Sequence, residues 1–226
     1  MRKNGKYSCV LFDMDGTLVD SYQGIFESYR WTMQRMNREF GGDAFVQRAI
    51  GAPLIWVFRE LCDMSFSEAE QAAACYREYY AAKGKHQIRV YDGMKETLLQ
   101  LQKADCRLGV ATLKSEQFAK EILAEQGLLH IFDTVCGMDT GDHFSKADLI
   151  QRCIRILGSR REETILVGDS AFDAEGARET GIAFLAVTYG FGFRSRIEAA
   201  EFSEIIADTT GKIFEKICLS GKEAGK

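Results

Sequence analysis

The chain alternates short apolar runs with amphipathic segments, and this rhythm restricts the fold more than any other feature. The apolar runs do not alternate with polar residues, which is typical of parallel strands covered on both faces. We expect strands at Ser8–Phe12, Arg107–Thr112, Thr134–Gly137, Thr164–Gly168 and Ala183–Thr188, with a weaker one at Glu204–Ala207. Helical spacing predicts helices between them at Met94–Ala104, Ser115–Gln126, Ser145–Leu157 and Ala171–Thr180. Repeated strand–helix units predict an α/β fold with a doubly wound, Rossmann-like parallel sheet.

The region from about 20 to 90 breaks this rhythm. It shows helical patterns at roughly 20–38, 43–50, 53–63 and 67–83, and no convincing strand. We therefore predict an α-helical cap domain, residues 20–90, inserted after the first strand of a core made by residues 1–19 and 91–226. A total of 226 residues suits either one large domain or one domain that carries a smaller one.

Composition excludes several classes of protein. The net charge of −4 argues against a protein that binds a nucleic-acid polymer mainly through phosphate contacts. The 7 cysteines are odd in number and include no CxxC pair, which favours reduced thiols in a cytoplasmic protein. No apolar run is long enough for a membrane span or a signal peptide. We expect a soluble cytoplasmic protein, as a monomer or a homodimer, with no membrane partner.

Two carboxylates directly follow the first predicted strand. Asp13 and Asp15 lie in the run DMDGTL, in which Gly16 permits a sharp exit turn. Ligands of an open parallel sheet bind beyond the carboxyl ends of its strands. Two acids there repel each other unless a hard divalent cation with oxygen ligands offsets the repulsion. A helix N-cap or a surface turn is the alternative, because Asp-Gly is a common turn pair.

A second acidic pair follows the predicted strand Thr164–Gly168. Asp169 stands at the strand end, and Asp173 comes one helical turn later. Capping of the next helix by Asp169 or Ser170 is the alternative, although capping and metal binding are compatible.

Hydroxyl and ammonium groups lie at or after the ends of two further predicted strands, Arg107–Thr112 and Thr134–Gly137. Thr112 ends a predicted strand, Lys114 comes just after it, and Lys146 opens the helix that follows Thr134–Gly137. Such groups suit a phosphoryl group, although each taken singly is more simply a cap or a solvated lysine.

The four motifs taken in order, DxDGTL, a strand-end threonine, a lysine and GDxxxD, resemble the haloacid dehalogenase-like superfamily. The helical insertion looks like subfamily I of that superfamily, with its phosphoglycolate phosphatase, 5′-nucleotidase and β-phosphoglucomutase relatives. The resemblance covers nearly the whole chain. It implies a magnesium-dependent phosphatase that acts on a small phosphorylated metabolite.

The resemblance also implies a role for each acidic residue. Asp13 would be the nucleophile that forms an aspartyl-phosphate, and it would bind Mg²⁺. Asp15 would be the general acid and base, and its backbone carbonyl would bind the metal. Asp169 would be a further Mg²⁺ ligand, and Asp173 would orient the metal site or bind through water.

The remaining roles concern the phosphoryl group and the substrate. Thr112 would bind the phosphoryl oxygens, and Lys146 would stabilise both the nucleophile and the phosphoryl charge. Further substrate contacts are expected from Gly16, Leu113, Lys114, Arg48 and Trp56. The stretch Val187–Gly192 resembles the part of related phosphatases that forms a wall near the metal.

Other activities stay open at this point. A 5′-nucleotidase and a pyrophosphatase are alternatives to a phosphoglycolate phosphatase-like enzyme. A β-phosphoglucomutase-like mutase would have an arginine at about the position of Leu54. A dehalogenase normally lacks the acid at Asp15. A receiver-like phospho-acceptor module also gathers acids around magnesium, but it has no use for a 70-residue helical insertion.

Overall fold

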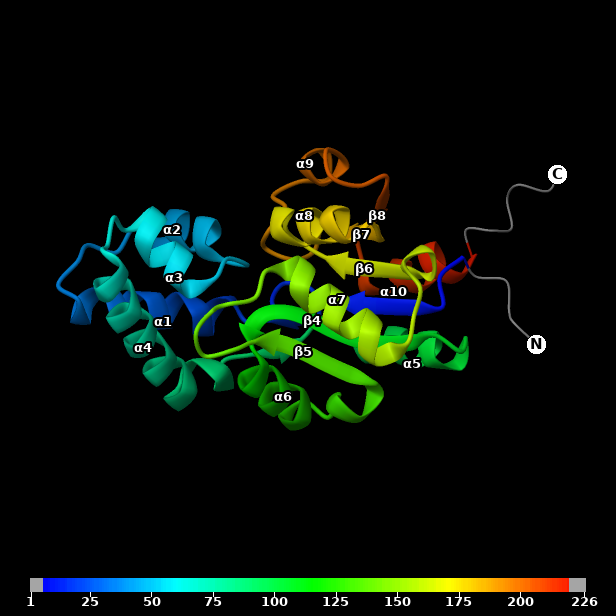
Figure 1. Ribbon diagram of the computed structural model, residues 1–226, viewed down its shortest axis with the longest axis horizontal. Helices are drawn as coiled ribbons and strands as arrows, with labels where there is room; N and C mark the ends of the chain where they lie inside the picture. The colour runs from blue at the N-terminus through cyan, green and yellow to red at the C-terminus, as the bar shows by residue number, and fades with distance from the viewer. Residues whose placement is uncertain (1–5, 220–226) are drawn as a thin grey trace.

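The computed structural model describes residues 6–219, and within them it contains a six-stranded parallel sheet of order β5-β4-β1-β6-β7-β8 (Figure 1). The strands are β1 (Cys9–Phe12), β4 (Arg107–Ser115), β5 (Thr134–Met138), β6 (Thr164–Gly168), β7 (Ala183–Val187) and β8 (Ile205–Ala207). β1 pairs with β4 on one side and with β6 on the other. The strand order therefore reverses at the end of β1, which is where open parallel sheets bind their ligands.

Alternation along each strand creates two apolar layers. Val10 and Phe12 belong to one buried cluster, whereas Cys9 and Leu11 belong to the other. Helices α5 (Met94–Lys103), α6 (Glu116–Glu125) and α10 (Thr210–Phe214) cover the first layer. Helices α7 (Lys146–Leu157) and α8 (Ala171–Thr180) cover the second, and the short α9 (Arg196–Ala200) follows β7. The doubly wound α/β fold class is confirmed.

A helical lobe lies beyond the carboxyl ends of the strands (Figure 1). It consists of α1 (Tyr22–Arg35), α2 (Gly42–Ala49), α3 (Leu54–Trp56) continued by a π-helical turn (Val57–Leu61), and α4 (Phe66–Ala82). The ring of Tyr29 lies at the centre of its core, within 4.7–5.8 Å of the rings of Phe45, Phe58 and Tyr76. All these helices fall within the predicted 20–90 segment, and we propose that this segment acts as a cap domain.

Two details differ from the sequence prediction. A short antiparallel pair, β2 (Val19–Asp20) with β3 (Arg89–Val90), joins the two chain crossings between cap and core. Two-residue strands are too short to leave a periodic pattern in a sequence. β4 does not end at Thr112 but continues to Ser115 through an irregularity in its pairing with β5 between Ala111 and Ser115. Thr112 therefore lies inside a distorted strand, a common arrangement beside active sites.

Within residues 6–219, no helix is long and apolar enough to cross a membrane.

Candidate active site

The loop after β1 places Asp13 at the centre of the sheet edge. The backbone N–H of Asp13 donates to the carbonyl of Val167 on β6 at 2.9 Å, so the neighbouring strand fixes this residue. Gly16 then adopts a φ of +83°, which an L side chain rarely accepts. A Cβ atom on Gly16 would lie 2.1 Å from Oδ2 of Asp169. The glycine is thus needed both for the turn and for the close approach of this loop to Asp169.

Three buried carboxylates meet at this edge. One oxygen each from Asp13, Asp169 and Asp173 lies within 4.8 Å of the others. Burial raises the pKa of Asp13 to about 7, although the ammonium of Lys146 lowers it. Burial also raises the pKa of Asp169 well above its usual range, and the neighbouring Asp173 adds to that rise. Buried acids this close favour protonation unless a cation balances them, so the donor set fits a hard divalent metal ion.

The loop after β7 orients Asp169. Its Oδ2 accepts hydrogen bonds from the backbone N–H groups of Phe191 at 3.1 Å and Gly192 at 2.8 Å. A Cβ atom on Gly190 would lie 2.5 Å from the same oxygen. The expected wall at Val187–Gly192 therefore contacts the acidic cluster and fixes the direction of one carboxylate.

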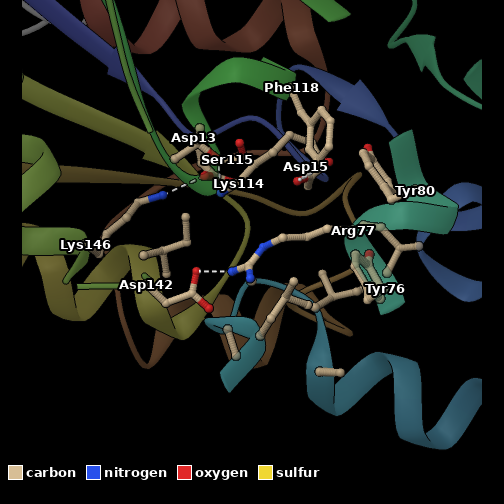
Figure 2. A pocket seen from close by; sticks show the side chains of 18 of the residues that line it. Asp13, Asp15, Tyr76, Arg77, Tyr80, Lys114, Ser115, Phe118, Asp142 and Lys146 are labelled. Carbon is tan, nitrogen blue, oxygen red and sulfur yellow. Dashed lines mark hydrogen bonds and ion pairs between the residues drawn. The ribbon is translucent and has the colours of Figure 1, made fainter. Parts of the chain in front are cut away.

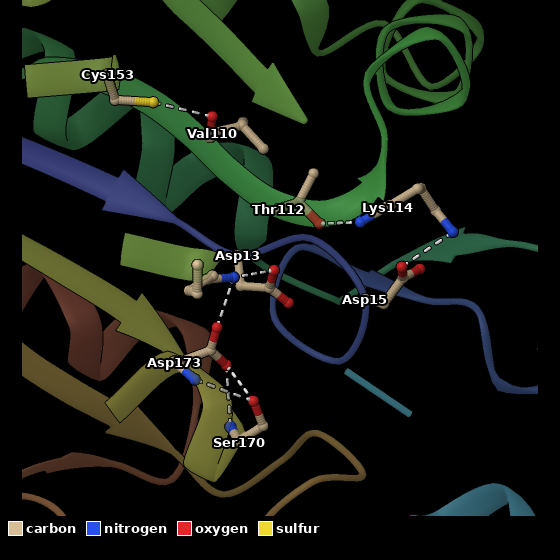
Figure 3. Close-up of polar contacts among 9 residues, drawn as sticks. Asp13, Asp15, Val110, Thr112, Lys114, Cys153, Ser170 and Asp173 are labelled. Carbon is tan, nitrogen blue, oxygen red and sulfur yellow. Dashed lines mark hydrogen bonds and ion pairs between the residues drawn. The ribbon is translucent and has the colours of Figure 1, made fainter. Parts of the chain in front are cut away.

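Lys146 connects two of the acids. It opens α7, and its Nζ lies 2.6 Å from an oxygen of Asp13 and 2.6 Å from an oxygen of Asp173. Burial alone would lower the pKa of Lys146, but the two carboxylates outweigh it and raise that pKa above its usual value. Asp173 also completes a capping box with Ser170 at the start of α8 (Figure 3). The capping alternative and the site assignment are thus both compatible with the structure.

Asp15 lies apart from the cluster and faces a different partner. Its Oδ2 is 2.9 Å from Nζ of Lys114 (Figure 3). Its other carboxylate oxygen accepts a hydrogen bond from the hydroxyl of Ser21. Lys114 in turn lies over the ring of Tyr80 on α4, 4.3 Å from its centroid. Thr112 is buried nearby, where its hydroxyl accepts a hydrogen bond from the backbone N–H of Lys114 at 3.2 Å. Asp15 is therefore held by side chains outside the acidic cluster.

A cavity of about 90 Å³ separates these residues from the helical lobe. Asp13, Asp15, Thr112, Lys146 and Asp173 line it from the core. The opposite wall comes from the helical lobe and includes Tyr29, Ile50, Tyr76, Arg77 and Tyr80. Figure 2 shows Tyr76, Arg77 and Tyr80 of α4 around the cavity. The structure thus brings polar residues from the β1 loop, β4, α7 and α8 together in one cavity, which the helical lobe covers.

The residues predicted as further substrate contacts differ in their position relative to the cavity. Leu113 and Lys114 line the cavity, and Gly16 packs against Asp169. Arg48 is exposed on α2, outside the cavity lining. Trp56 is 41% exposed and packs edge-on against Phe172 of the core, with ring centroids 5.9 Å apart. These two residues remain predicted substrate contacts, without a place in the cavity wall of this conformation.

Sequence reasoning missed several residues of the site. Arg77 and Asp142 form an ion pair across the cavity, and Ser21 binds Asp15. Arg77 lies on a predicted helix, but no sequence signal tells which face of that helix points to the core.

Comparison with known proteins agrees with this geometry. The family model of the haloacid dehalogenase-like hydrolases matches residues 10–187. A 5′-nucleotidase from Pseudomonas aeruginosa is 31% identical over 204 residues, which cover 90% of this chain and 92% of that protein. The tyrosine-protein kinase PtkA of Mycobacterium tuberculosis is 34% identical over 185 residues, which cover 81% of this chain and 62% of that protein.

The fold is shared with solved structures as well. The crystal structure of a predicted phosphatase from Clostridium acetobutylicum superposes with a TM-score of 0.88 at 31% identity, covering 93% of this chain and 98% of that one. Together with the roofed site at the ends of the strands, these matches identify the chain as a phosphatase of the haloacid dehalogenase-like hydrolase family.

Proposed function

We propose that the protein hydrolyses a small phosphomonoester through an aspartyl-phosphate on Asp13. The observation that carries the proposal is the separation of the acids into two groups. Asp13 belongs to a buried cluster with Asp169 and Asp173, whereas Asp15 faces the same cavity from outside that cluster. One carboxylate can then act as a nucleophile while another exchanges protons.

The acidic cluster is the proposed Mg²⁺ site. Asp13, Asp169 and Asp173 supply carboxylate oxygens, and the backbone carbonyl of Asp15 is proposed as a further ligand. Bound there, the ion would offset the negative charge of a phosphate dianion that Asp13 would otherwise repel.

The first step transfers the phosphoryl group. A carboxylate oxygen of Asp13 attacks phosphorus, the bond from phosphorus to the leaving oxygen breaks, and its electron pair stays on that oxygen. Asp15 donates the proton that the leaving oxygen needs. Lys146 donates hydrogen bonds at the nucleophile, and Thr112 supplies a hydroxyl for the phosphoryl oxygens.

The second step releases phosphate. Water attacks the phosphorus of the aspartyl-phosphate while Asp15 accepts a proton from it, and the bond between phosphorus and the Asp13 oxygen breaks. Inorganic phosphate and the free carboxylate result. The cap residues over the cavity limit the entry of other acceptors.

The cavity favours a compact leaving group. Pockets for drug-sized ligands enclose about 300–1,000 Å³, whereas this one encloses about 90 Å³. This size supports a phosphoglycolate phosphatase-like activity, or hydrolysis of pyrophosphate, with the cap in its present position. A 5′-nucleotidase activity is the second candidate, supported by the relative of that name and by the rings of Tyr29, Tyr76 and Tyr80 in the wall. A nucleoside would require the cap to move outward.

The test is the hydrolysis of p-nitrophenyl phosphate with Mg²⁺, with p-nitrophenol and inorganic phosphate measured together. We expect equal amounts of both products, no turnover by Asp13→Asn, and normal turnover by Asp63→Asn, a matched change at an exposed position. Circular dichroism checks that both variants fold. Near-normal turnover by Asp13→Asn would refute the nucleophile assignment. An excess of p-nitrophenol over phosphate would show transfer to an acceptor other than water.

A further inference from the structure

Arg77 brings a positive charge from the cap into the cavity. It lies on α4, and among the described cavity-lining residues it is the only lysine or arginine that the cap supplies. Its side chain is 27% exposed. Figure 2 shows the guanidinium group reaching from α4 across the cavity toward the core. A cation at this position would lie beside the leaving group, the part of the substrate that points away from the phosphoryl group.

Asp142 holds this arginine in place. Its Oδ1 lies 2.6 Å from Nη2 of Arg77, and its Oδ2 accepts a hydrogen bond from the backbone N–H of Ile55 at 3.3 Å. The Asp142 side chain is 6% exposed, and the residue has a φ of +53°. A buried carboxylate in a sparsely populated backbone conformation, bound to two elements of the cap, fixes the guanidinium before any ligand arrives.

The guanidinium has more donors than this partner uses. A guanidinium carries five N–H donors in a planar fork, and the contact with Asp142 runs through Nη2. A second carboxylate or a phosphate matches the remaining donors of such a fork.

The core cations are already engaged at the other end of the cavity. Lys146 is bound to Asp13 and Asp173, and Lys114 is bound to Asp15. Their charges therefore lie beside the groups proposed to handle the phosphoryl transfer. Arg77 is also ion-paired, to Asp142, but it lies at the cap end of the cavity, away from these groups, and its contact with Asp142 runs through Nη2 alone.

From this arrangement we propose that Arg77 determines specificity by binding an anionic group on the leaving part of the substrate. The inference rests on the proposed function of the same site. It specifies the substrate class as compact phosphomonoesters with a carboxylate or a second phosphate, and it makes Asp142 the positioning residue for Arg77. A latch that only keeps the cap closed would use the same ion pair but would not discriminate between leaving groups.

The test compares two substrates of similar size, 2-phosphoglycolate and ethyl phosphate, which differ in the presence of a carboxylate. The measured quantity is the ratio of their kcat/KM values. We expect the wild-type protein to prefer 2-phosphoglycolate, and Arg77→Gln to reduce the ratio at least about tenfold, the scale of one lost hydrogen bond to a charged group. Arg77→Lys, which keeps the charge without the fork, should retain part of the preference. Asp142→Asn should also lower the ratio, but by less than Arg77→Gln.

The control is Arg59→Gln, at an exposed cap arginine outside the cavity lining, which should keep the wild-type ratio. An unchanged ratio in Arg77→Gln would overturn the proposal, and an equal fall for both substrates would show a latch instead. A wild-type preference for ethyl phosphate would overturn it as well. If the wild-type protein hydrolyses neither ester nor p-nitrophenyl phosphate, the proposed function fails, and this inference fails with it.

Discussion

The acidic cluster predicts that Mg²⁺ stabilises the protein more strongly at neutral than at acidic pH. Burial raises the pKa of Asp13 from 3.8 to about 7 in the metal-free protein. Between these pH values the folded state keeps a proton that the unfolded state has lost, so the free energy of unfolding falls as pH rises. The pKa values of the folded and unfolded states differ by about three units, so the free energy of unfolding is lower by about 4 kcal/mol above pH 7. A metal ion needs the ionised carboxylate and therefore offsets this loss.

The size of the metal effect follows from binding linkage. At a concentration about 100 times its Kd, Mg²⁺ adds about 2.7 kcal/mol, or roughly 5 to 10 °C in Tm for a chain of this length. Near pH 5 the ion must displace a proton from Asp13, which weakens its apparent affinity about tenfold for each pH unit below 7. The same concentration should then raise Tm by only about 1 to 2 °C.

Thermal melts with and without Mg²⁺ at about pH 5 and about pH 8 measure both effects. The Asp13→Asn variant serves as the control, because it removes one of the carboxyls with a raised pKa and should reduce the pH dependence of the metal-free protein. Equal increases of Tm at both pH values in the wild-type protein would refute the assignment of Asp13 to a metal site.

Three further substitutions test individual contacts. Gly16→Ala places a methyl group 2.1 Å from Oδ2 of Asp169, so titration calorimetry should show Mg²⁺ binding weakened about 10- to 100-fold; an unchanged Kd would contradict the packing described. Lys146→Met leaves buried carboxylates without their partner and should lower the metal-free unfolding free energy by about 3–5 kcal/mol in urea titrations, whereas a loss below about 1 kcal/mol would argue against that ion pair. Lys114→Met removes the ammonium 2.9 Å from Asp15 and should reduce kcat by about 10²-fold; wild-type kcat would show that Lys114 does not position the acid.

Much of the fold could be read from the sequence because its signals are local. The strand at Thr164–Gly168 and the helix at Ala171–Thr180 have the predicted bounds, since an apolar run and a capped helix each mark their own ends. The β2–β3 pair was not predicted, because its strands are two residues long and are joined only by the return of the chain from the cap. Thr112 was expected at a strand end, but pairing with β5 extends β4 beyond it.

The same distinction between local sequence signals and tertiary contacts applies to the residues of the site. Asp13 and Asp169 follow buried strands directly, so their positions on the sheet edge could be predicted from sequence. Arg77 and Asp142 meet only because the cap packs over the core, and nothing local in either segment indicates that contact. Sequence patterns therefore predict the reacting end of the site, whereas the cap-facing end depends on tertiary packing.

The central claim is that Asp13 carries the phosphoryl group, and a trapped intermediate tests it most directly. The variant Asp15→Asn should accept a phosphoryl group from p-nitrophenyl phosphate, because p-nitrophenolate leaves without a proton from an acid. It should then accumulate the phosphoenzyme, because water lacks its base. Acid quenching followed by borohydride reduction converts a phosphorylated aspartate to homoserine, which peptide mapping by mass spectrometry locates. We predict homoserine at position 13, whereas homoserine at another aspartate, or none in a protein that releases p-nitrophenol, would contradict the account.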